Sequence, residues 1–223
     1  MSIGWFISLA AASIIFFVFS IINSRANFKN RFQKVYDLRN HFPYEFNYES
    51  SFSLNILGNV ALIMSAAFSV GLFALTAVKV RTNGYVLYSL ITGILFSIFV
   101  GVIHFIPLKT MKTHMIFSVL LLGLAFITPC AIGLGSFAYY QETKKIFPLV
   151  LFIVSIVVGV FYFGVAMNPK LSMNFKLIAA TDEKGNQIYL RPKFIIMAFS
   201  EWLASFGLFV SQILLLLFMV AIL

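Results

Sequence analysis

Charged residues are scarce in this sequence of 223 residues, and acidic residues are especially few. Only 10% of the chain is charged, and seven aspartates and glutamates stand against 16 lysines and arginines. A soluble domain usually has about a quarter of its residues charged. Because 61% of the chain is hydrophobic, with 27 phenylalanines, a soluble fold could not bury so much apolar surface. The composition therefore predicts a membrane protein.

Cysteine and histidine are also rare, which excludes several kinds of site. The single Cys130 allows neither a disulfide within the chain nor a cysteine metal cluster. Among the histidines we expect only His104 near the membrane core, which leaves no histidine pair for a membrane haem. No long apolar run contains a lysine, as a retinal pigment requires, and the motifs of intramembrane proteases are missing. We therefore expect no cofactor, no metal site and no catalytic activity.

Long apolar runs are what the sequence has in abundance. A hydrocarbon core of about 30 Å needs roughly 20 helical residues. The runs that reach this length are residues 3–23, 54–78, 85–107, 115–139, 146–167 and 194–222. They are apolar on nearly every face, whereas the strands of a membrane barrel alternate apolar and polar residues. The sequence thus predicts an all-α membrane protein, a single six-helix transmembrane bundle over residues 1–223.

The lysines and arginines lie in the connections between these runs and predict the orientation of the bundle. Twelve fall in the first, third and fifth connections, and four fall in the second and fourth. Loops rich in these residues stay in the cytoplasm. We therefore expect a multi-pass protein of the cell membrane with both termini outside. The net charge of +9 then suits anionic lipid headgroups at the cytoplasmic face rather than nucleic acid.

The first connection, residues 24–53, combines basic and aromatic residues. From Arg25 to His41 its apolar residues recur at helical spacing, which predicts an amphipathic helix lying on the membrane face or extending from it. An aromatic-rich stretch follows, where Pro43 prevents the helix from continuing. Two interpretations stay open for this segment: an interfacial collar, or a docking site for a protein partner or a lipid.

The fifth connection, residues 168–193, contains the sequence of a short cytoplasmic β-hairpin. Two apolar runs, 175–180 and 187–191, flank the turn residues Asp182 to Gly185. A two-stranded hairpin alone is marginally stable in water. It is therefore expected either to rest on the bundle or to offer an edge to a partner.

Glu201 is the one acidic residue inside any of the long apolar runs. Ser205 and Gln212 share its helix face, and facing lipid would be costly for a carboxylate, so this face should point into the bundle. Other polar residues are expected at a similar depth in the neighbouring helices. The predicted cluster comprises Glu201, His104, Asn55, Asn59, Ser205 and Gln212. Its carboxyl could be structural, as a neutral hydrogen-bonding group, or could carry a proton.

Pro129 is the one proline in the middle of an apolar run, followed by Gly133 and Gly135. This pattern predicts a kink in the fourth helix and makes Pro129 a candidate hinge. Proline kinks also occur in membrane helices that have no binding site.

Two functions are compatible with these residues. The one we favour is a non-enzymatic accessory, assembly or immunity-type protein that acts through contacts of residues 25–52 and 170–193. The alternative is a carrier of a small solute or ion, coupled to protons through Glu201. A polar cavity that reaches Glu201 would favour the carrier, and a closed core would favour contacts.

Overall fold

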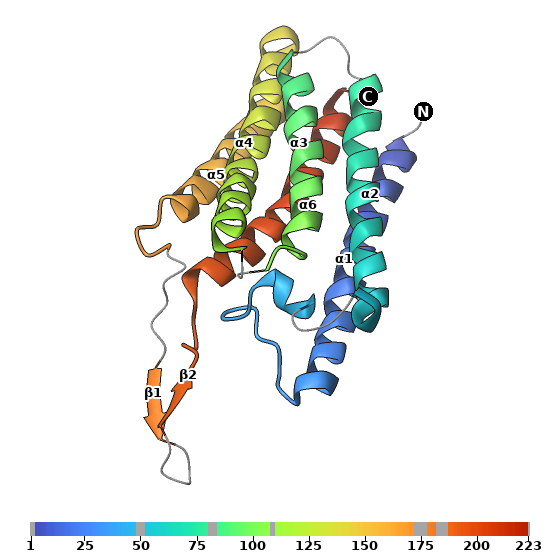
Figure 1. Cartoon of the computed structure of the whole chain (residues 1–223). Coiled ribbons are helices and arrows are strands. Elements are labelled where there is room, and N and C mark those ends of the chain that lie inside the picture. The colour runs from blue at the N-terminus through green and yellow to red at the C-terminus, as the bar shows by residue number, and fades with distance from the viewer. Residues whose placement is uncertain are drawn as a thin grey trace.

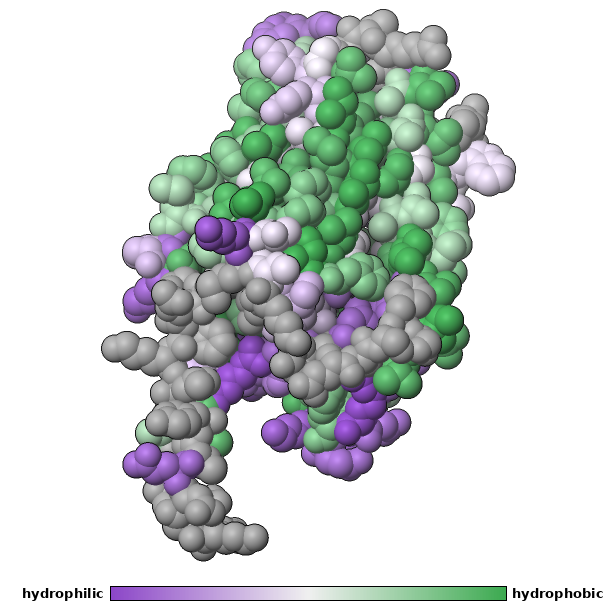
Figure 2. All heavy atoms as spheres, viewed as in Figure 1, coloured by the Kyte–Doolittle hydropathy of each residue, from purple (hydrophilic) through white to green (hydrophobic). Residues whose placement is uncertain are grey.

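The computed structural model describes residues 3–47, 52–79, 84–107, 110–171, 178–181 and 187–222. Most of them belong to long helices (Figure 1), namely α1 (Ile3–Phe32), α2 (Ile56–Lys79), α3 (Gly84–Ile103), α4 (Met111–Thr143), α5 (Ile146–Ala166) and α6 (Ile196–Ile222). These six helices are long and apolar enough to cross a membrane. The structure thus agrees with the predicted all-α membrane bundle. Figure 2 shows an apolar band over most of the bundle, with hydrophilic surface at both ends.

Helix α6 is the central helix of the bundle. Consecutive helices from α1 to α5 pack against each other, and α6 contacts α1, α3, α4 and α5. It also reaches α2, because the Gln212 side-chain amide donates a hydrogen bond to Ser69 Oγ at 2.6 Å. Polar residues of α6 are therefore surrounded by protein rather than lipid, as the sequence predicts for Glu201.

Small residues let the helices approach closely, as is usual in membrane bundles. Ser155 and Gly159 lie one turn apart on α5 and are buried against α4. A Cβ atom on Gly159 would meet Cys130 Sγ and would lie 3.2 Å from the Phe126 carbonyl oxygen. The contact between α4 and α5 therefore depends on this glycine.

Helix α1 continues well beyond its apolar run. The basic residues from Arg25 to Arg31 extend it to Phe32, so the first part of the predicted amphipathic helix is an extension of α1. The helix ends earlier than predicted because Gln33 adopts a positive φ of 52°, a left-handed conformation typical of helix ends. The following residues, 33–47, are here called the cap segment.

The cap segment turns back beneath the bundle, below α3 and α6 in Figure 1. It includes a 3₁₀ helix, η1 (Pro43–Asn47), and a second one, η2 (Phe52–Asn55), leads into α2. Its aromatic residues pack against the rest of the protein, and their predicted role as an interfacial collar stays a prediction. The buried ones are Tyr36, Phe42, Tyr44 and Phe46.

Two short strands project from the same end of the bundle as the cap segment (Figure 1). Strand β1 (Ile178–Thr181) pairs antiparallel with β2 (Gln187–Leu190), with Ile178 opposite Leu190. We call this pair the β arm. The predicted turn at Asp182 to Gly185 lies outside the described residues, so the complete hairpin stays a prediction. The same holds for the side of the membrane on which it lies.

Candidate functional site around Glu201

Glu201 is fully buried inside the bundle, in the second turn of α6, and bonds to two side chains of α4. His114 Nε2 lies 2.9 Å from Glu201 Oε1, and Ser118 Oγ donates to the same oxygen at 2.6 Å. Neither His114 nor Glu201 exposes any side-chain surface. His114 and Ser118 are four residues apart on one face of α4 and therefore meet Glu201 together.

The hydrogen bonds of His114 require a proton between its Nε2 atom and the Glu201 carboxyl. His114 Nδ1 lies 2.7 Å from the Ile106 carbonyl oxygen, and because a carbonyl only accepts, Nδ1 must carry a hydrogen. The contact between Nε2 and Oε1 then contains one further proton, held either by the imidazole or by the carboxyl. The other carboxyl oxygen, Oε2, is buried and has no hydrogen-bond partner among the described residues. The site can therefore hold a proton away from water.

The cap segment covers this pair with aromatic rings. The Phe42 and Tyr44 rings lie 5.8 Å and 5.5 Å from the His114 ring, edge-on to it. Trp202, next to Glu201, donates through Nε1 to the His41 carbonyl oxygen at 3.0 Å. The cap segment thus separates the His114–Glu201 pair from the solvent at this end of the bundle.

Glu45 ties the cap segment to the base of the β arm. Its Oε2 accepts the Phe42 backbone N–H at 2.7 Å, and its Oε1 accepts from Arg191 at 2.6 Å. The Ile195 N–H also donates to the Arg39 carbonyl oxygen at 2.8 Å. Phe42 also packs against His114. A series of contacts therefore leads from Arg191 at the base of the β arm through Glu45 and Phe42 to the buried His114–Glu201 pair.

The six predicted residues do not form one cluster, and the predicted partners of Glu201 are wrong. Asn55 and Asn59 hydrogen-bond to Ser24 and Asn47 instead. Gln212 donates to Ser13 and Ser69. These residues face other neighbours, because the sequence does not say how helices are ordered around the bundle.

Two other members of the predicted cluster lie close to Glu201 without bonding to its carboxyl. The Ser205 hydroxyl donates to the Glu201 backbone carbonyl at 2.8 Å. His104 Nδ1 donates to the Val100 carbonyl oxygen at 2.8 Å, and its ring packs edge-on against Trp202 at 5.4 Å. His104 is thus a neighbour of the site through Trp202 and not a partner of the carboxyl.

His114 was missed because it directly precedes the fourth apolar run, which we expected to begin at residue 115. The structure corrects this expectation, since α4 begins at Met111 and includes His114 in its first turns. The sequence nevertheless contained a pattern that could have identified His114. His114 and Ser118 are spaced four apart, as a polar pair on one helix face is.

Pro129 lies inside α4, which is helical without interruption from Met111 to Thr143. It has no N–H to donate to the carbonyl of Ala125. The hinge role predicted for it stays a prediction.

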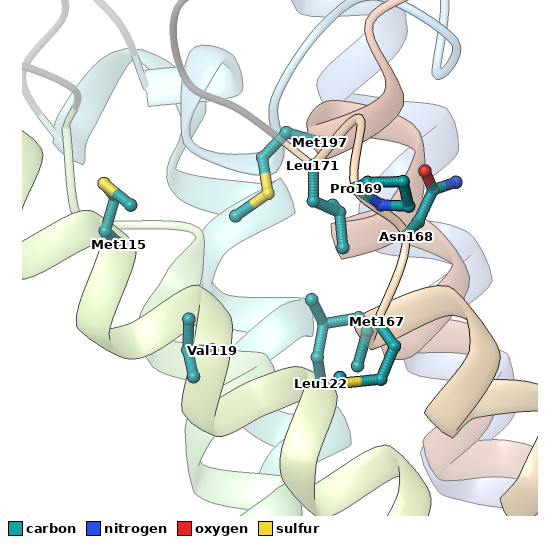
Figure 3. Close-up of a pocket in the computed structure, with 9 residues that line it drawn as sticks. Met115, Val119, Leu122, Met167, Asn168, Pro169, Leu171 and Met197 are labelled. Atoms are coloured by element: carbon teal, nitrogen blue, oxygen red, sulfur yellow. The ribbon is translucent and has the colours of Figure 1, made fainter.

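None of the three cavities described below is lined by Glu201. One, of about 330 Å³, lies between α4 and the segment that joins α5 to α6 (Figure 3), with Met115, Leu122 and Met197 among its lining residues. The others, of about 490 and 250 Å³, lie beside α1. These three cavities therefore give no access to the Glu201 carboxyl.

The described residues include no group of three histidine, cysteine, aspartate or glutamate side chains placed to hold a metal ion. Comparisons of the chain with protein-family models, with curated proteins and with solved structures gave no match. A functional proposal therefore has to rest on the residues and contacts described above.

Proposed function

We propose that this chain is a multi-pass membrane protein that acts without catalysis, by binding a protein partner through the β arm and the neighbouring cap segment. The observation that carries the proposal is the β arm itself. The main contacts of β1 and β2 are with each other, and Ile178 and Leu190 are 52% and 48% exposed. Two paired strands without further support are marginally stable.

A strand from a partner protein would stabilise the β arm by adding backbone hydrogen bonds and apolar contacts. Each arm strand has an outer edge whose backbone groups can pair with an extended segment of another protein, and exposed apolar side chains on the arm add contact area. The neighbouring connections carry a net positive charge, with five lysines and arginines against three acidic residues in residues 24–53 and five against two in residues 168–193. This charge favours an acidic partner.

The burial of Glu201 among the described residues supports contacts over transport. Glu201 is enclosed by α4, by α6 and by the aromatic rings of the cap segment, and the three described cavities do not reach it. A carrier needs a path along which a solute reaches its coupling group.

A proton-coupled carrier remains a second candidate because of one specific observation. The His114–Glu201 contact holds a proton, and Glu201 Oε2 is buried without a partner among the described residues. Glu201→Gln separates the two candidates. A contact protein keeps its function with the amide, whereas a proton carrier stays folded and loses pH-dependent uptake.

Photo-crosslinking from the arm in living cells tests the proposal. A photoreactive amino acid at position 178 or 190 should give one discrete adduct with another protein. The same probe at Ile146, which is 75% exposed and begins α5 at the end of the bundle away from the β arm (Figure 1), should give none. Ile188→Pro, which disrupts β2 but lies outside the bundle, should abolish the adduct.

Two results would contradict this proposal. Equal adducts from positions 178 and 146 would mean nonspecific neighbours, and an adduct of two copies of this 25.1 kDa chain would exclude a different protein as the partner.

A further inference from the structure

The largest of the three cavities lies where α1, the cap segment and the base of the β arm meet. Its volume is about 490 Å³. The lining residues include Phe28, Phe32, Lys34, His41, Glu45 and Arg191. Aromatic rings and cationic groups thus face the same space.

The charged groups around this cavity leave an excess of positive charge. Asp37 pairs with Arg39 at 2.8 Å and Glu45 pairs with Arg191 at 2.6 Å, whereas Lys34 takes part in neither ion pair. Burial lowers the pKa of His41 below its ordinary value, so this histidine adds no charge at neutral pH. An anion entering the cavity would therefore meet Lys34 and the guanidinium of Arg191.

The cavity lies beside the part of α1 that continues past its apolar run, at the outer edge of the expected headgroup layer. The predicted apolar run of α1 ends at residue 23, and Phe28 lies five residues further, about 7.5 Å along the axis at 1.5 Å per residue. The headgroup layer extends several ångströms beyond the hydrocarbon on each side of a bilayer. Phe28 and Phe32 pack against each other with ring centroids 4.7 Å apart and form an apolar wall.

We propose that this cavity binds the phosphate group of an anionic phospholipid. Lys34 and Arg191 are its cationic contacts, and Phe28 and Phe32 contact the glycerol and the first methylene groups. Inorganic phosphate could use the same two cations but would gain nothing from the apolar wall. The site does not depend on the protein partner proposed above.

Glu45 acts as an internal competitor in this site. Its carboxylate already occupies Arg191, so an incoming phosphate shares that guanidinium with it. Removing the negative charge of Glu45 should therefore strengthen lipid binding, while removing the positive charge of Lys34 should weaken it.

The test measures binding of phosphatidylglycerol to the purified full-length chain by titration in detergent and native mass spectrometry. Phosphatidylcholine serves as the zwitterionic comparison and should bind weakly. Lys34→Gln should reduce the affinity for phosphatidylglycerol about fivefold, the loss that corresponds to about 1 kcal/mol for one basic group near a membrane surface. Glu45→Gln should raise the affinity.

Lys29→Gln is the matched control. Lys29 is exposed on α1 close to Lys34 in sequence but does not line the cavity, so its loss should leave the affinity unchanged. Lys34 is itself exposed, so its replacement should not affect folding, which tryptophan fluorescence can verify.

Two results would overturn the assignment. If Lys29→Gln weakens binding as much as Lys34→Gln, the attraction is a general property of this surface. If millimolar inorganic phosphate displaces the lipid completely, the site recognises phosphate and not a phospholipid.

Discussion

Replacing Glu201 by leucine should destabilise the bundle by an amount that follows from its hydrogen bonds. In Glu201→Leu, the single hydroxyl hydrogen of Ser118 can turn from the lost carboxyl to the His114 carbonyl oxygen 2.9 Å away, and His114 keeps its bond to Ile106. One buried atom, His114 Nε2, loses its partner. An unsatisfied buried polar atom costs about 1–3 kcal/mol in soluble proteins, and side-chain hydrogen bonds in membrane proteins average about 0.6 kcal/mol with a maximum of about 1.7.

We therefore expect Glu201→Leu to lower the free energy of unfolding by about 1–2 kcal/mol, within the range of these two estimates. Glu201→Gln should cost no more than about 0.6 kcal/mol, because its amide can donate to a neutral His114 Nε2. Unfolding in mixed micelles can be followed by tryptophan fluorescence, since one of the two tryptophans is Trp202, adjacent to the site.

A double-mutant cycle tests whether the contact itself is responsible. Once His114 is replaced by leucine, no imidazole remains to be left unpaired, so adding Glu201→Leu should cost about 1 kcal/mol less than it does alone. Additive effects of the two substitutions would refute the reasoning, because they would show that the two side chains do not stabilise each other.

Two further predictions concern packing and orientation. Gly159→Ala should destabilise the protein by about 1–3 kcal/mol, since its Cβ would collide with α4, whereas Gly164→Ala, whose Cβ would meet no atom within 4 Å, should be neutral in the same unfolding assay. In a variant without Cys130, a cysteine at position 142 should react with an impermeant reagent added outside the cell and one at position 184 should not; the reverse pattern would invert the predicted topology.

The fold class could be predicted from the sequence because lipid imposes a one-dimensional constraint. A helix must present about 20 apolar residues to cross the hydrocarbon, and each of the six helices contains such a run. The inward position of Glu201 could be predicted for a similar reason, since lipid offers a carboxyl no hydrogen-bond partner. Helix ends were less predictable, as α1 shows by continuing to Phe32 through basic residues that tolerate the headgroup region.

The partner of Glu201 was decided by the tertiary structure alone. Position along a helix fixes the depth of a residue at 1.5 Å per residue, which placed Asn59 and His104 at a suitable level. Depth does not fix which helices are neighbours or which faces meet, and the packing of α6 against α4 brought Glu201 to His114, 87 residues away.

The position of the cap segment was also decided by the tertiary structure. From the sequence, its aromatic residues were equally compatible with a collar at the membrane interface and with burial against the bundle. Its burial depends on contacts with distant parts of the chain, such as the ion pair between Glu45 and Arg191, 146 residues apart. Local sequence contains no information about such pairs, because their stability arises only when the folded bundle brings both residues to the same place.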